Sequence, residues 1–240
     1  MGCFRAPRSW PSCLLEVIVL APEPRQAPRD LVIHASFFAA RPPINGQPYV
    51  GRYSLQAAVE HLRYMANSAG REGLFGSHPD KFIGVDVHAI AKETALSLAP
   101  ELLAAKGPIW RLFASVNEDD ARAAGGRLFH RRPWEDSTRA LLPWLADEMG
   151  IYIPLLRWIA VSHRGRTGKE RHPHLHVMMW SATGSGRLRK RTLLAARLRW
   201  QEDLYLAGGL TPDPELEAWI AADLARLPAA ANDALLDIGW

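Results

Sequence analysis

Hydrophobic and polar positions along the chain follow two different periods, which predicts strands interleaved with helices. Leu31–Phe38 (LVIHASFF) and Ile109–Val116 (IWRLFASV) combine β-branched and aromatic residues as strands do. Arg157–Ser162 and Leu175–Trp180 predict two further strands, joined by a basic loop over 163–173. Because strands and helices are mixed along the chain and the last two strands are placed to form a hairpin, we expect an α+β fold with an antiparallel sheet.

Apolar residues spaced three and four apart predict helices between these strands. Ser54 is a suitable N-cap for a helix that runs to about Asn67, with its apolar face formed by Leu55, Ala58, Val59, Leu62 and Met65. We expect further helices over 87–105, 134–149, 188–206 and 214–226, a helix that starts at Asn117, and loops rich in Pro or Gly over 41–52 and 68–80.

Composition sets limits on the kind of protein. The chain has 240 residues, of which 48% are apolar and 22% are charged, and this balance excludes a mainly disordered protein. Its longest apolar stretch, Cys13–Ala21, is too short to span a bilayer, and the two cysteines imply no disulfide framework. We therefore expect a cytoplasmic globular protein with a mobile leader over 1–30, one domain over 31–206 and an acidic helical tail over 207–240.

Charge is distributed unevenly along the chain. Residues 157–199 carry eleven basic side chains and one acidic side chain, whereas residues 200–240 carry one basic and eight acidic side chains. The two blocks could pair with each other across the fold. A block this rich in arginine is also a candidate phosphate-binding surface. The residues that we expect to contact phosphates are Arg164, Arg166, Lys169, Arg171, Arg187, Arg189, Lys190 and Arg191.

Histidines gather next to this basic loop. Alternate residues of a strand point to the same side, so His174 and His176 can reach one ion. A third ligand must come from elsewhere, because His172 to His176 spans about 13 Å along a strand. His163, at the end of the preceding strand, is the expected third ligand, with His172 as the alternative. Three neutral imidazoles leave a divalent ion open to a phosphate oxygen, although solvated histidines without an ion are also compatible with the pattern.

Three segments in this order resemble a known family. They are HLRYMANSAGREGLFG, GPIWRLFASVNEDDARAAGGR and LRWIAVSHRGRTGKERHPHLHVMMWS. Together they resemble the MobA/MobL group of conjugative relaxases, which are metal-dependent HUH endonucleases of the single-tyrosine P class, over roughly residues 31–200. The resemblance implies a central antiparallel sheet with helices over one face. It also implies strand-specific nicking at a plasmid transfer origin, through a covalent 5′-phosphotyrosine and a free 3′-hydroxyl, followed by rejoining.

Carried over by position, the resemblance makes Tyr64 the nucleophile and His163, His174 and His176 the ligands of a divalent ion, with Mg or Mn expected and Zn, Ni or Co as alternatives. On a helical wheel, Tyr64 lies about 180° from the apolar face of its helix, which leaves it free to face a groove. His61, one turn away, is the expected general base, and Tyr53 is the rival nucleophile. Arg111 and Ser115 are expected to contact DNA. The tryptophans of the strands, Trp110, Trp158 and Trp180, could stack on bases or pack in the core.

The implied partner is single-stranded DNA at a transfer origin, together with accessory relaxosome proteins and a coupling protein, and we expect no membrane insertion. Two alternatives keep the same fold and the same basic block. One is a rolling-circle replication initiator or transposase of the HUH type, and the other is an inactive module that binds origin DNA. A small-molecule metal enzyme would leave the basic block without an explanation.

Overall fold

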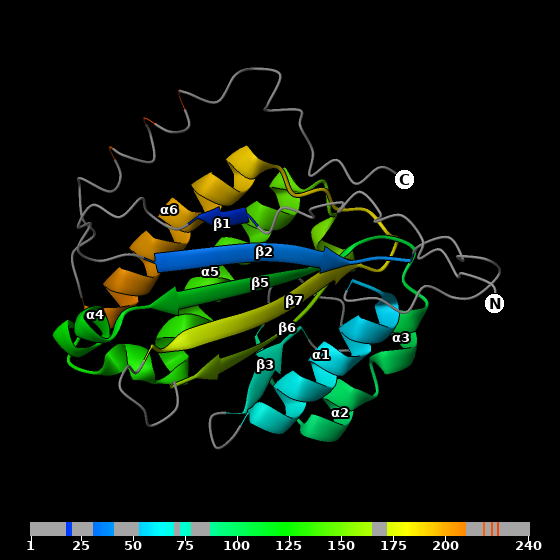
Figure 1. Cartoon of the computed structure of the whole chain (residues 1–240), viewed down its shortest axis with the longest axis horizontal. Coiled ribbons are helices and arrows are strands. Elements are labelled where there is room, and N and C mark those ends of the chain that lie inside the picture. Colours follow the sequence, from blue (N-terminus) through cyan, green and yellow to red (C-terminus); the bar gives the residue numbers. More distant parts are fainter. Residues whose placement is uncertain are drawn as a thin grey trace, which may run out of the picture.

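A computed structural model describes residues 18–20, 31–40, 53–69, 73–77, 87–164 and 172–209, with three single helical positions nearer the C-terminus. Its centre is a seven-stranded sheet in the order β1-β2-β5-β7-β6-β3-β4, and every neighbouring pair of strands is antiparallel (Figure 1). The strands are β1 (Ile18–Leu20), β2 (Leu31–Phe38), β3 (Leu74–Gly76), β4 (His88–Ile90), β5 (Ile109–Val116), β6 (Leu156–His163) and β7 (His174–Ser181).

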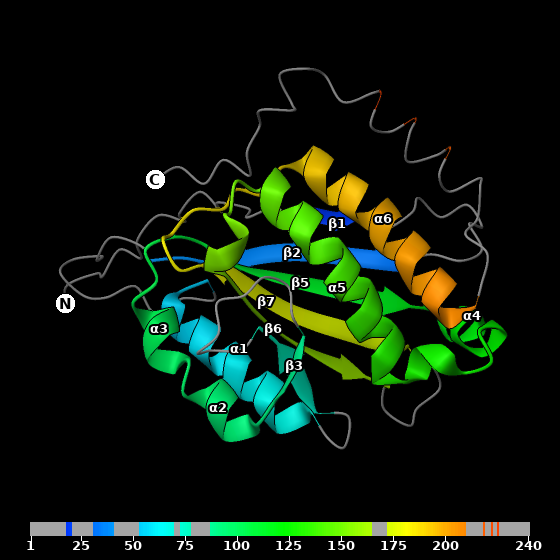
Figure 2. The same ribbon diagram turned by 180° about the vertical axis from the view of Figure 1, so that it is seen from behind.

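Helices cover both faces of this sheet. The longer helices α5 and α6 pack against each other across one face (Figure 2), and the group α1, α2 and α3 lies on the other (Figure 1). The expected α+β class with an antiparallel sheet is confirmed, but the expectation of helices over one face is incomplete. The bounds are α1 (Leu55–Ser68), α2 (Lys92–Leu96), α3 (Ala99–Leu103), α4 (Glu118–Ala123), α5 (Arg131–Glu148) and α6 (Lys190–Gly208), with 3₁₀ turns at Arg127–Phe129 and Ile153–Leu155.

The alternation of β7 explains why both faces are covered. Leu175, Val177 and Met179 belong to the core under α5 and α6, whereas Met178 and Trp180 belong to the core under α1 to α3. A strand that is apolar on both sides must be covered on both sides. On the side of β7 that faces α1, the first residues are histidines and the later ones are apolar. The candidate site lies at the histidine end.

Helix α1 forms as its sequence predicts. The Ser54 hydroxyl accepts a hydrogen bond from the backbone N–H of Ala57, which caps the helix. The residues of α1 that are buried are Ala58, Val59, Leu62, Met65 and Ala66. The apolar face that the sequence predicts is therefore the face that packs on the sheet, and the opposite face is left for other uses.

The segment expected as one helix over 87–105 is instead β4 followed by two short helices. Pro100 stands in the first turn of α3, where it needs no backbone N–H, and its ring could not have continued α2. Two strands also fall where none was expected: β1 in the segment predicted as a leader and β3 in the predicted loop. Each has three residues, too few to show a period of two. Most of 1–30 and of the expected tail lies outside the described residues.

A buried hydrogen-bond cluster joins α4 to α6. Asn117 caps α4 by accepting a hydrogen bond from the Asp120 N–H, and its side-chain amide donates to the Asp120 carboxylate at 2.9 Å. The Tyr205 hydroxyl donates to the same carboxylate at 3.0 Å. Tyr205 is fully buried, so this bond is shielded from water. Within the described part of the chain, no helix is both long and apolar enough to cross a membrane.

Replacing Tyr205 with Phe tests this cluster. The ring volume is kept, but the Asp120 carboxylate loses a buried donor, so the free energy of unfolding should fall by about 1–3 kcal/mol. Urea denaturation of Tyr205→Phe measures this loss. Tyr152→Phe is the control, because Tyr152 is 70% exposed. Equal stability of the two variants would contradict the role of the cluster.

Candidate functional site

Three histidines meet where β6 ends and β7 begins. The strand register pairs His163 with His174, and His176 follows two positions along β7 on the same face. One ring nitrogen from each of the three histidines lies within 4.8 Å of the other two. The sequence-based expectation that His163 joins the pair is confirmed, and the cluster could hold a metal ion. We refer to His163, His174 and His176 as the histidine triad.

A local hydrogen bond orients one ring of the triad. The Nδ1 of His174 lies 2.9 Å from the carbonyl oxygen of His172, so the neutral ring donates there and keeps Nε2 as an acceptor. His172 thus contributes its backbone to the site. The Nδ1 of His176 is buried and has no hydrogen-bond partner among the described residues. A buried ring nitrogen without a partner is costly in free energy, which is consistent with a site that is completed by a bound group.

Burial keeps these imidazoles neutral. Desolvation, with a further contribution from His174, lowers the pKa of His163 to about 4. Desolvation, followed by the neighbouring His61 and the rest of the triad, lowers the pKa of His176 to about 3. The pKa of His174 is lowered mainly by burial as well. Since metal ions bind the neutral ring, the triad has the donor set and the protonation state that a divalent ion requires.

Tyr64 projects from α1 toward the triad. It lies off the apolar face of the helix, as predicted, and is 50% exposed. Its ring centroid lies 5.6 Å from that of His176 and 6.2 Å from that of His163. One turn later, the Ser68 hydroxyl donates to the Tyr64 carbonyl at 2.7 Å and lies 3.4 Å from Nε2 of His163. A half-exposed phenol therefore lies beside a candidate metal site.

His61 lies beside Tyr64, as the sequence predicts for residues three apart on a helix. Their ring centroids are 5.9 Å apart and the rings are stacked. The Nε2 of His61 is buried without a hydrogen-bond partner among the described residues, and burial, with Arg111 nearby, lowers its pKa to about 4. His61 is thus a neutral acceptor. The rival nucleophile, Tyr53, precedes the N-cap of α1, and its carbonyl accepts a hydrogen bond from the Ala39 N–H after β2.

Strands β2 and β5 continue the sheet face that carries the triad, and we refer to this part of the face as the floor of the site. Arg111 and Ser115 alternate onto the same face of the sheet as His176, and Ser115 lies opposite His174 in the register. The Nε of Arg111 donates to the Ser36 hydroxyl at 2.9 Å, and its charge helps to lower the pKa of both His61 and His176. Both residues that the sequence assigns to DNA contact from β5 therefore lie at the site.

Three residues of the site were missed in the sequence. His34 and Phe113 lie side by side on the floor, with ring centroids 5.8 Å apart, and Phe113 lies 5.1 Å from His176. Ser68, at the end of α1, bridges Tyr64 and His163. His34 and Ser36 alternate with apolar residues along β2, and this pattern could have indicated that one face of the strand is polar.

The basic residues are not gathered at one place. Arg164 directly follows His163, whereas Arg187, Arg189, Lys190 and Arg191 are exposed at the start of α6. The Arg187 N–H donates to the Met149 carbonyl at the far end of α5, so this group is not brought to the triad. Arg157 is buried beside Glu101, and Arg197 is fully buried. Arg166, Lys169 and Arg171 lie outside the described residues.

The strand tryptophans belong to the core. Trp110, Trp158 and Trp180 are at most 3% exposed, so core packing is confirmed and base stacking is excluded for this arrangement. The indole N–H of Trp180 donates to Glu101 at 2.9 Å, and that of Trp110 donates to the Gly186 carbonyl at 3.2 Å. Among the described aromatic residues of the floor, Phe113 is the one in ring contact with the triad.

Comparison of the chain with models of protein families, with curated proteins and with solved structures found no match. The side chains that the fold brings together are therefore what indicates a function. These are a histidine triad, a half-exposed tyrosine and a neutral histidine, with an arginine on the floor beside them.

Metal binding distinguishes the triad from its neighbour His172. His163→Ala removes one nitrogen of the triad, so its affinity for Mn²⁺ or Co²⁺ should fall at least tenfold, the size of effect that even outer-shell changes produce. His172→Ala keeps the carbonyl that orients His174 and should bind as the unchanged protein does. Isothermal titration calorimetry measures both. If His172→Ala loses the metal and His163→Ala keeps it, the ligand assignment is wrong.

The lowered pKa values also predict how stability depends on pH. In the metal-free protein, His61, His163 and His176 take up protons in the unfolded state near pH 6.5 but resist protonation when folded. Their contribution is complete above about pH 6.5 and is lost as the pH falls toward about 4, by up to about 1.4 kcal/mol per pH unit for each of the better buried His61 and His176 and by less for the more exposed His163. Urea denaturation across this range should show a shallower slope in His176→Gln. An unchanged slope would contradict burial of a neutral His176.

Proposed function

We propose that the protein is a metal-dependent DNA strand transferase of the relaxase type, in which Tyr64 attacks a DNA phosphate. The observation that carries the proposal is the half-exposed Tyr64 ring lying against His163 and His176. A phosphate at the triad would lie within reach of the phenol. The resemblance to MobA/MobL relaxases supports the same roles for these residues and suggests a transfer origin as the target, in the cytoplasm.

The roles divide between the triad and α1. When bound, a divalent ion would withdraw charge from a phosphate oxygen and neutralise charge that builds up during attack. His163, His174 and His176 would hold it. The Oη of Tyr64 forms a bond to phosphorus while the bond from phosphorus to O3′ breaks, which leaves a 5′-phosphotyrosine and a 3′ oxygen that takes up a proton. Attack by a 3′-hydroxyl on the phosphotyrosine reverses the step and rejoins the strand.

The phenolic proton needs an acceptor. His61 is stacked on Tyr64, and its buried Nε2 has no competing partner among the described residues. With a pKa of about 4 it is a weak base, so it accepts the proton only as the bond to phosphorus forms. We expect His61→Ala to slow adduct formation, whereas removal of Tyr64 abolishes it.

Arg111 supplies a positive charge at the floor of the site. Its guanidinium is held by Ser36 and lies over the Phe38 ring, 5.6 Å from the centroid. A fixed guanidinium near the triad stabilises the charge of a bound phosphodiester before the reaction begins. DNA binding by this face, and partners such as accessory relaxosome proteins and a coupling protein, are part of the proposal.

A nicking assay tests the proposal. The substrate is a plasmid that carries the noncoding DNA beside the gene, incubated with Mn²⁺ or Mg²⁺ and separately with EDTA. We expect a protein–DNA adduct that survives a denaturing gel, needs the metal, and is absent in Tyr64→Phe and His174→Ala. Tyr53→Phe and Tyr152→Phe are the controls and should form the adduct.

The outcomes separate the competing functions. An adduct that persists in Tyr64→Phe and disappears in Tyr53→Phe would move the nucleophile to the rival tyrosine. Tight binding of DNA without an adduct, with every metal, would favour the inactive origin-binding module. An adduct formed at a replication origin, with none at the transfer origin, would favour a rolling-circle initiator.

A further inference from the structure

A groove lined by charged side chains of both signs lies at the first turns of α5. The groove of about 390 Å³ is bounded by six residues that all carry titratable side chains: His130, Arg131, Arg132, Glu135, Asp136 and Arg139. The lining thus contains three guanidinium groups and two carboxylates. None of these residues was among the sequence-predicted site residues, because the charge of this segment is nearly balanced along the chain.

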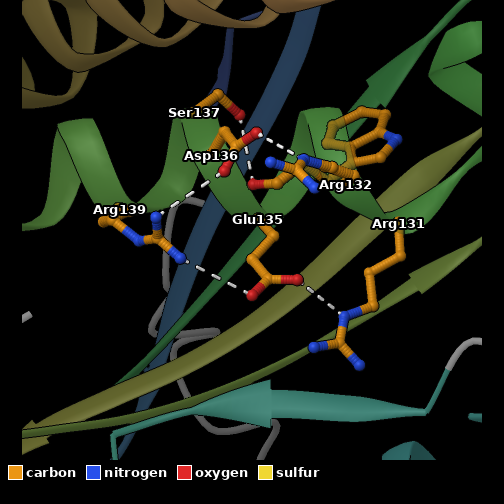
Figure 3. A network of polar contacts seen from close by, with 7 residues as sticks. Arg131, Arg132, Glu135, Asp136, Ser137 and Arg139 are labelled. Carbon is orange, nitrogen blue, oxygen red and sulfur yellow. Dashed lines mark hydrogen bonds and ion pairs between the residues drawn. The ribbon is translucent and has the colours of Figure 1, made fainter. Parts of the chain in front are cut away.

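The two carboxylates lie between the arginines and pair with them. Figure 3 shows Glu135 between Arg131 and Arg139, and Asp136 facing Arg132 and Arg139. The ion pair from Arg131 to Glu135 is short, at 2.8 Å, whereas those of Arg132 and Arg139 are 3.5–3.8 Å long. At these longer distances the guanidinium groups attract the carboxylates but leave most of their hydrogen-bonding capacity for another acceptor.

Arg132 and Arg139 are accessible. Their side chains are 89% and 48% exposed. A row of exposed guanidinium groups along one helix suits a chain of phosphates, because each guanidinium can bind a phosphate through two hydrogen bonds.

Arg164 connects this groove to the candidate active site. It follows the triad residue His163 directly in the chain, and its guanidinium lies 3.4 Å from Nδ1 of His130, at the rim of the groove. The Arg164 side chain thus joins the rim of the groove to the residue that follows His163, around the end of β6.

We propose that this groove binds the phosphodiester backbone of the DNA strand that is cut at the triad, on the part of the strand that extends past the end of β6. The proposal depends on the function proposed above. Arg164 contacts the strand between the two sites, and Arg132 and Arg139 bind successive phosphates further along. The groove thus lengthens the contact with the strand and takes no part in the reaction of Tyr64.

Binding of fluorescein-labelled single strands tests the groove. The probes are about 30 nucleotides and about 8 nucleotides long, and both are centred on the nick. The short probe covers only the site at the triad, whereas the long probe also reaches the groove. For the double variant Arg132→Ala, Arg139→Ala, the dissociation constant for the long strand should rise roughly tenfold at low salt. The slope of log affinity against log salt should fall by about 1.4, since each phosphate contact on single-stranded DNA contributes about 0.7. Binding of the short strand should not change.

Arg122→Ala is the matched control. Arg122 is also an exposed arginine paired with a glutamate four residues away on a helix, but it lies on α4 outside the groove. The groove proposal is overturned if the double variant binds the long strand as Arg122→Ala does, or if both probes lose affinity equally. Adduct formation on the short strand is scored separately, so loss of the Tyr64 chemistry and loss of the groove are read from different measurements.

Discussion

The candidate site depends on the antiparallel pairing of β6 with β7. This pairing places His163 opposite His174 and puts His176 on the same face, although ten residues separate the two strands' histidines in the chain. A shift of one residue in the register would turn His174 and His176 into the core under α5 and α6 and bring Leu175 and Val177 out. The apolar residues of β7 thus fix the register, and the register assembles the triad.

The second requirement is a helix with two different faces. The apolar face of α1 packs over the sheet, and this packing points His61, Tyr64 and Ser68 at the triad. One face of α1 thus packs in the core, and another face carries the residues of the candidate site. Because the same face of the sheet changes from apolar to polar residues along β5 and β7, the helix that completes the second core also forms a wall of the site.

The long strands, the capped helix α1, the grouping of the triad and the position of Tyr64 off the apolar face could be predicted from the sequence, because each depends on a period or a spacing within a short segment. The role of Tyr64 as nucleophile was implied by the family resemblance alone. His34, Phe113 and the arginines of α5 could not be predicted, because their roles depend on which strands are neighbours and on how a helix lies over the sheet. Trp110 and Arg197 show the reverse: residue types that suit nucleic acid are used in the core. Trp110 is buried because its position in the alternation of β5 points it into the core. Arg197 is buried because α6, the helix that carries it, packs over it.

Anomalous diffraction from crystals soaked with Mn²⁺ tests the central claim most directly, because it locates the ion without depending on the DNA sequence. The account predicts a strong peak at about 2.0–2.3 Å from one nitrogen of each of His163, His174 and His176, on the side that faces Tyr64. A peak held by other residues, or none at the triad in an accessible crystal form, would contradict a metal-assisted attack by Tyr64.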